Sequence, residues 1–71
     1  MADSVYKFIE LVGTSSESWE KAAAAAVTQA SKSVRDLRVA EIVQLDVAIE
    51  NGKIKSYRAK VKLSFKIDSK G

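Results

Sequence analysis

The residues best suited to bind a ligand lie in the second half of the chain, where polar and apolar side chains alternate. The basic members of the last stretch are Arg58, Lys60, Lys62 and Lys66. Guanidinium and ammonium groups that line a pocket attract phosphate or another acidic ligand. The same row can instead be a solvated strand face whose charges keep an edge soluble. Both interpretations remain open, whereas nucleic-acid binding is not expected because no aromatic side chains are interleaved on this face.

Three acidic residues on the preceding stretch are further candidates. Asp46 and Glu50 share one side of a strand, and their carboxylates could give oxygen ligands to a hard cation such as calcium. Two carboxylates at this spacing also occur often by chance, so they are weak metal candidates. Glu41 interrupts an otherwise apolar strand face. We expect it to pair with a basic residue of a neighbouring chain, because an unpaired buried carboxylate is costly.

The composition argues against several classes of function. The 71 residues include no histidine or cysteine and only three glycines, so the usual catalytic bases, nucleophiles, zinc ligands and glycine-rich phosphate loops are lacking. We therefore do not expect an enzyme. The net charge of +3 is only mildly basic. With no long apolar run and no secretory signal, the sequence predicts a soluble cytoplasmic protein that does not bind membranes.

Two strands carry these candidates. Residues 57–67 alternate strictly between apolar and polar, which is typical of a half-buried strand. Residues 39–49 alternate as well. Their predicted apolar face consists of Val39, Val43, Leu45, Val47 and Ile49, with Glu41 as the one exception.

The first half of the chain predicts a strand and a helix to cover these two strands. Residues 5–12 are rich in strand formers, and residues 13–16 are expected to end that strand. From about residue 16 to 35 the apolar period becomes 3.6. Thr14 with Glu17 has the spacing of a capping box, although Ser15 or Ser16 could cap instead. The predicted helical stripe is Trp19, Ala23, Ala26, Val27, Ala30, Val34 and Leu37. Trp19 on this stripe is expected to be a core or interface aromatic, and Glu17 and Lys21 a favourable ion pair.

The turn between the last two strands contains Asn51 and Gly52. A two-residue turn would pair Ile49 with Ile54 and would put the two apolar faces on opposite sides of the sheet. We therefore expect a three-residue loop, 50–52, with Gly52 in the left-handed region and Ile49 opposite Lys53. It would also place Leu45 opposite Tyr57. A bulge further along the strands would have the same effect.

These elements predict one α+β domain, residues 1–71, in the order β-α-β-β, with loose ends at residues 1–4 and 68–71. Three long antiparallel strands with one helix on one face leave apolar surface uncovered. A chain this small and without disulfides is marginal alone. We expect a strongly bent sheet whose remaining apolar surface is covered by neighbouring subunits.

The stretches VYKFIELVGTSSESWEKAAAAAV, VRDLRVAEIVQLDV and SYRAKVKLSFKI resemble the dodecin family along nearly the whole chain. The resemblance implies a β-α-β-β subunit whose bent sheet wraps around its helix, assembled as a hollow homo-dodecamer of tetrahedral symmetry. Members of that family typically bind flavins (FMN or riboflavin) as stacked pairs at subunit interfaces and act in storage. Some also hold coenzyme A.

Two positions depart from the family pattern. The flavin-stacking tryptophan that precedes Ala40 is replaced by Val39, and the flavin-bonding glutamine after Tyr57 is replaced by Arg58. The resemblance therefore implies a small-ligand storage shell whose flavin site is modified or lost. The alternative is a structural, ion-binding dodecameric assembly with no flavin role. Arg38, Val39 and Arg58 make the chain resemble more closely a subgroup of the family that is described as calcium-binding. The ligand-pocket candidates are Arg38, Val39, Glu41, Tyr57 and Arg58.

Overall fold

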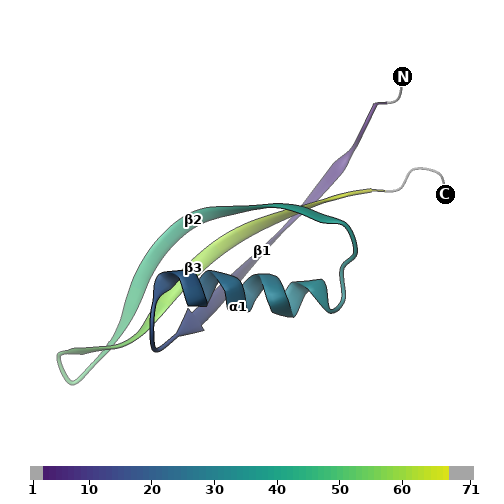
Figure 1. Ribbon diagram of the computed structural model, residues 1–71. Coiled ribbons are helices and arrows are strands. Elements are labelled where there is room, and N and C mark those ends of the chain that lie inside the picture. The colour runs from purple at the N-terminus through teal and green to yellow at the C-terminus, as the bar shows by residue number, and fades with distance from the viewer. Residues whose placement is uncertain (1–2, 68–71) are drawn as a thin grey trace.

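The fold is a three-stranded antiparallel sheet that bends around a single helix (Figure 1). The computed structural model describes residues 3–67, so most of the loose ends expected at residues 1–4 and 68–71, namely 1–2 and 68–71, lie outside the described residues. The elements are β1 (Tyr6–Ser15), α1 (Trp19–Ser31), β2 (Leu37–Glu50) and β3 (Lys53–Lys66), and the strand order is β1-β3-β2. The predicted β-α-β-β order and antiparallel pairing are confirmed.

Gly13 does not end the first strand, contrary to expectation. β1 continues to Ser15, and Gly13 is buried opposite Ala59 of β3. A Cβ atom added at Gly13 would lie 2.0 Å from the backbone oxygen of Ala22 in α1. The glycine is therefore a packing residue, which lets the helix backbone lie directly on the strand.

Helix α1 begins later and ends earlier than predicted. Its N-cap is Ser18, whose hydroxyl accepts a hydrogen bond from the Lys21 N–H at 3.0 Å. The expected capping by Thr14, Ser15 or Ser16 is wrong, and Ser15 Oγ accepts instead from the Glu17 N–H in the preceding turn. The predicted ion pair between Glu17 and Lys21 is confirmed.

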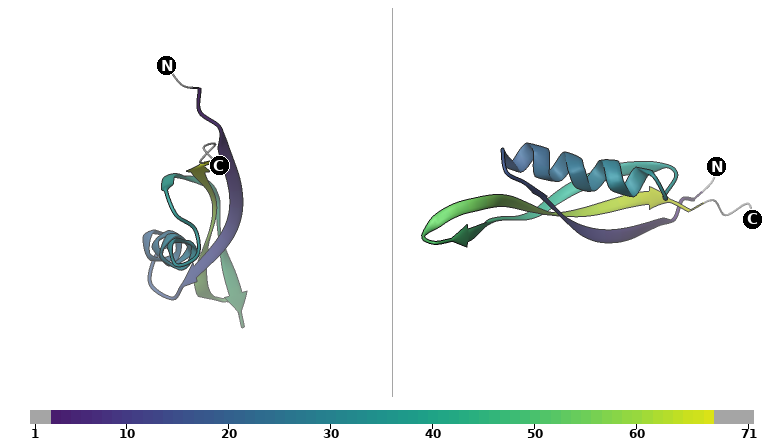
Figure 2. Two further views of the ribbon diagram at one scale, coloured as in Figure 1. Left: turned by 90° about the vertical axis from the view of Figure 1, so that its right-hand side faces the viewer. Right: turned by 90° about the horizontal axis from the view of Figure 1, so that it is seen from below.

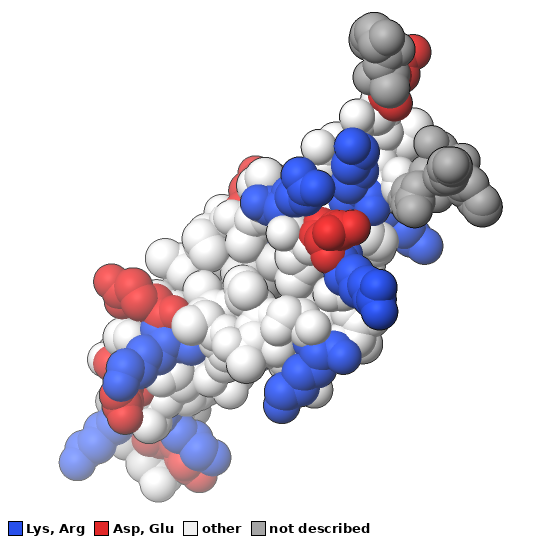
Figure 3. Space-filling model, turned by 45° about the vertical axis from the view of Figure 1, so that its right-hand side comes forward, with Lys and Arg blue, Asp and Glu red and all other residues white. Residues whose placement is uncertain are grey.

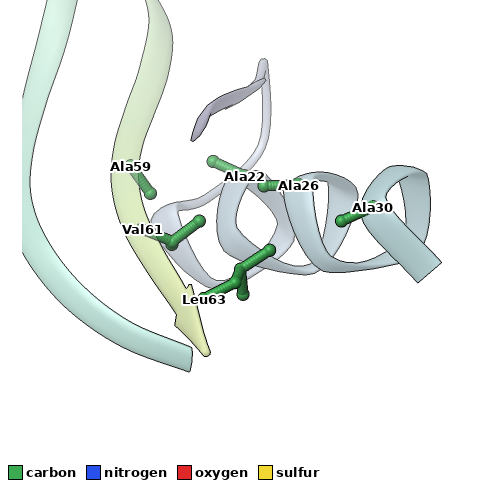
Figure 4. Packing of buried hydrophobic residues seen from close by; sticks show 6 residues of the cluster. All are labelled: Ala22, Ala26, Ala30, Ala59, Val61 and Leu63. Carbon is green, nitrogen blue, oxygen red and sulfur yellow. The ribbon is translucent and has the colours of Figure 1, made fainter. Parts of the chain in front are cut away.

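The core lies between one face of α1 and the middle strand. Small side chains on the helix allow a close approach, which buries the larger side chains of β3 (Figure 4). The buried residues are Ala22, Ala26 and Ala30 on α1, and Ala59, Val61 and Leu63 on β3. Ala22, which is fully buried, was missing from the predicted helical stripe.

The β2–β3 connection is a two-residue turn, so the expected three-residue loop is wrong. Asn51 and Gly52 both have positive φ, at 55° and 74°, and Ile49 pairs with Ile54. This conformation matches the natural twist of two paired strands. A register shift between Ala48 and Ile49 follows at once, so the predicted alternative of a bulge further along is confirmed, as is positive φ at Gly52.

A second bulge, between Ile42 and Gln44, changes which side chains of β2 face the helix. Beyond it Ile42 pairs with Val61, so the even-numbered residues join the helix-facing side. Val39 and Glu41 consequently lie on the opposite side, which we call the outer face of the sheet. The predicted single apolar face of residues 39–49 is therefore wrong.

The chain is elongated and leaves much apolar surface open. Its radius of gyration is 14.8 Å, against about 11 Å for a compact domain of this length. Its accessible surface is 5370 Å², against about 4300 Å² for a typical monomer of this mass. The β2–β3 hairpin extends past the helix (Figure 2), and Ile49 at its end is 67% exposed.

Charged side chains do not cover this open surface evenly. On the face shown in Figure 3 they gather mainly toward the two ends and along one margin, with a broad uncharged area between them. Within residues 3–67 no helix is long and apolar enough to cross a bilayer.

Candidate functional site

Arg58 and Asp46 form a bidentate ion pair on the outer face of the sheet. They are cross-strand partners on β3 and β2. Arg58 Nε donates to Asp46 Oδ1 at 2.8 Å, and Arg58 Nη2 donates to Oδ2 at 3.2 Å. The hydrogen bond from Arg58 holds the pKa of the Asp46 carboxyl below its usual value, and the carboxylate raises the pKa of the guanidinium. The carboxylate partner of Arg58 within the chain is therefore Asp46.

Trp19, on the helix side of the sheet, contacts the backbone of the same Asp46 residue. Its indole Nε1 donates to the carbonyl oxygen of Asp46 at 3.0 Å. Its ring meets Tyr57 edge to face, with centroids 5.1 Å apart and planes at 72°. Tyr57, a ligand-pocket candidate, thus faces the helix side and supports Trp19. Trp19 as a whole remains 38% exposed.

Arg38 and Val39 lie far from Arg58 along the sheet. They border a hollow of about 140 Å³ together with Val27, Leu37, Ala40 and Leu63. Val39 pairs with Ser64, six residues from Arg58 along β3, which corresponds to about 20 Å. One small ligand can touch both positions only if they come from different subunits.

Glu41 occupies a charged row that crosses all three strands of the outer face. It lies opposite Lys62 of β3, and Lys62 lies opposite Glu10 of β1. The Lys62 ammonium sits 5.5 Å from the centre of the Phe8 ring. Glu41 therefore has a base of its own chain as its cross-strand neighbour. That Glu41 belongs to a ligand pocket stays a prediction.

The two weak metal-ligand candidates, Asp46 and Glu50, are each paired with a basic side chain of the same chain. Both carboxylate oxygens of Asp46 accept from Arg58, and Glu50 lies 3.4 Å from the ammonium of Lys55. Among residues 3–67, no three Asp, Glu, His or Cys residues are grouped so that they could hold a metal ion. Calcium takes six to eight oxygen ligands, so one chain alone does not fit it at Asp46 and Glu50. Their role as ligands stays a prediction.

Two further hollows flank the Arg58–Asp46 pair. The one on the outer face holds about 90 Å³ and is lined by Val12, Gln44, Asp46, Arg58 and Lys60. The one between α1 and β2 holds about 430 Å³ and is mainly apolar, with Trp19, Glu20, Ala23, Ile42 and Leu45 around it. The sequence reasoning missed Gln44, because the register that pairs it with Lys60 is set by the bulge between Ala48 and Ile49.

Comparison with known proteins agrees with this architecture. The family model described as Dodecin matches residues 5–68. Calcium dodecin of Mycobacterium tuberculosis is 52% identical over 65 residues, which cover 90% of each chain. Dodecin of Thermus thermophilus is 36% identical over 64 residues, covering 90% of this chain and 93% of the relative.

Solved structures match over nearly the full length. Dodecin from Streptomyces coelicolor superposes with a TM-score of 0.89 at 34% identity, covering 96% of this chain and 97% of the other. The crystal structure of the M. tuberculosis calcium dodecin, described as a calcium-chelating antigen with a novel calcium-binding site, gives 0.82 at 46% identity and the same coverage. With its strand order, its bent sheet and these matches, the chain belongs to the dodecin family.

Proposed function

We propose that the protein is a closed dodecameric shell that binds and stores a small ligand, with the flavin site modified or lost. The observation that carries this proposal is the Arg58–Asp46 ion pair. It occupies a position where flavin-binding dodecins resembled by this chain have a neutral amide. A guanidinium held by a carboxylate does not offer the acceptor that such an amide provides.

The assembly part of the proposal is supported by the exposed apolar surface. Twelve large apolar side chains within residues 3–67 are exposed in the single chain, among them Val39 at 60% and Phe8 at 59%. Both outer strands, β1 and β2, also have one open edge. Burial of such surfaces and edges in an oligomer would stabilise a chain of 7.7 kDa that has no cysteine to form a disulfide.

The residues present do not fit a flavin held in the usual dodecin manner. Val39 has no aromatic ring to stack on an isoalloxazine. Titration of riboflavin and FMN, followed by flavin fluorescence, tests this. Weak or absent quenching supports the proposal, and nanomolar quenching would contradict it.

Calcium is a second candidate ligand, favoured by the 52% identity to a protein named calcium dodecin. Because the described part of one chain, residues 3–67, does not provide enough grouped carboxylates, we expect a calcium site to combine acidic residues of two or more subunits. Thermal melting in calcium, in magnesium and in a chelator tests this. A melting temperature raised by calcium alone supports a calcium site, and identical curves would exclude it. A non-enzymatic role and a cytoplasmic location stay predictions of the sequence.

A further inference from the structure

We propose that the hollow between Gln44, Arg58 and Lys60 on the outer face binds a tetrahedral oxyanion, either free phosphate or the phosphate group of a larger ligand. This inference deepens the proposed function, because it names the ligand class of the site that contains Arg58. The hollow lies over the middle strand. Lys60 stands at its centre, with Val12 of β1 and Gln44 of β2 as its cross-strand neighbours.

The lining offers many more hydrogen-bond donors than acceptors. Lys60 has an ammonium group, and Gln44 has an amide NH₂. Arg58 has five N–H donors, of which two are used by Asp46 and three remain. The one carboxylate, Asp46, already accepts from Arg58 through both of its oxygens. A ligand rich in acceptors therefore complements the site better than a cation or a neutral donor.

The volume and the net charge of the hollow further restrict the class of ligand. A volume of about 90 Å³ equals roughly three water molecules, so the hollow of a single chain suits a phosphate-sized group. Two cations and one anion leave one net positive charge in the lining. Asp46 accepts from two nitrogens of Arg58, which orients the remaining N–H groups of the guanidinium for a bound oxyanion.

Asp46 then sets the strength of the site. Its carboxylate cancels one of the two positive charges and keeps Arg58 in place. Replacing it by asparagine keeps the shape and the carbonyl that accepts from Trp19, and removes the negative charge. The lining would then carry two net positive charges, and oxyanion affinity would rise.

The test uses the complete, assembled protein with inorganic phosphate, and methyl phosphate as a second probe. Binding is followed by calorimetry and by the fluorescence of Trp19, the only tryptophan, which is bonded to Asp46. Sodium chloride at matched ionic strength controls for charge screening. We expect saturable phosphate binding with a dissociation constant of about 1 mM, as suits half-exposed groups. Tighter binding of methyl phosphate would identify a phosphate ester as the source, and tighter binding of inorganic phosphate would identify the free ion.

Three variants make the test specific. Lys60→Gln should weaken phosphate binding about tenfold, because one charge-assisted contact is lost. Asp46→Asn should strengthen it several-fold. Lys62 is the next residue of β3 on the outer face and does not line the hollow. The Lys62→Gln variant should therefore bind phosphate as tightly as the parent protein does. Equal responses to phosphate and chloride, or equal loss in the Lys60 and Lys62 variants, would overturn the inference. Neither result would affect the proposed function, which fails instead if the protein binds flavin tightly or does not assemble.

Discussion

Arg58 meets both carboxylate oxygens of Asp46, its cross-strand partner, at 2.8 and 3.2 Å. The pair links the middle strand to an edge strand on the face away from the helix. Asp46 makes a second contact on the helix side, where its backbone carbonyl accepts a hydrogen bond from Trp19. The altered ligand position is thus connected to the packing of α1 through a single residue.

Restoring the two altered positions should restore flavin affinity. Val39→Trp adds a stacking ring, worth about 0.5–1.5 kcal/mol beyond area burial. Arg58→Gln adds an amide that both donates and accepts, worth about 1 kcal/mol. The double variant should therefore bind riboflavin one to two decades more tightly, at about 1.4 kcal/mol per decade, in a fluorescence titration. Val39→Leu with Arg58→Lys is the control, and equal affinities in the two double variants would show that the pocket differs elsewhere.

The stabilising effect of the Arg58–Asp46 pair should disappear in acid. The pKa of Asp46 is lowered in the folded chain, mainly by its hydrogen bond from Arg58, so the folded state favours the carboxylate. The pair therefore stabilises the fold above the usual aspartate pKa of about 3.9, and this contribution is lost as pH falls through the lower folded-state value. Urea midpoints of the parent and of Arg58→Gln should differ at pH 7 and converge near pH 2. A difference that persists at pH 2 would mean that the pair is not its source.

Alanine at Gly13 should destabilise the fold much more than alanine at Gly52. At Gly13 the new Cβ would lie 2.0 Å from the Ala22 oxygen, so strand and helix must separate, at a cost of about 3 kcal/mol. At Gly52 the surroundings are open and only the positive φ is strained, at a cost of about 1 kcal/mol. Urea unfolding of both variants measures the difference. Equal losses would contradict the close contact between α1 and β1.

Removing the indole N–H should weaken the link between α1 and β2. Trp19→Phe keeps an aromatic ring against Tyr57 but loses the hydrogen bond to Asp46 O, worth about 1 kcal/mol. We expect a lower melting temperature, with the assembly retained. Tyr57→Phe, whose ring contact with Trp19 is kept, is the control and should melt close to the parent.

The sequence predicted the elements but not the register that assembles the site. Alternation and period identified three strands and a helix, because burial on one face imposes those repeats. The bulges leave no such signal. The bulge between Ala48 and Ile49 sets the register that places Gln44 opposite Lys60, and the bulge between Ile42 and Gln44 moves Glu41 to the outer face.

Local glycine and serine signals were misread for a related reason. Gly13 was interpreted as the end of a strand. Its lack of a side chain instead allows the strand to lie in contact with the helix. Several serines compete to cap α1, and tertiary packing selects Ser18. The partner of Arg58 was also missed, since Asp46 meets it only in the observed pairing.

Native mass spectrometry of the purified protein tests the central claim most directly, because it reports the number of subunits and any retained ligand together. The account predicts a single assembly of twelve 7.7 kDa chains, about 92 kDa, without the added mass of bound flavin. A stable monomer or dimer at micromolar concentration would contradict the shell, and a dodecamer that retains flavin would contradict the lost flavin site.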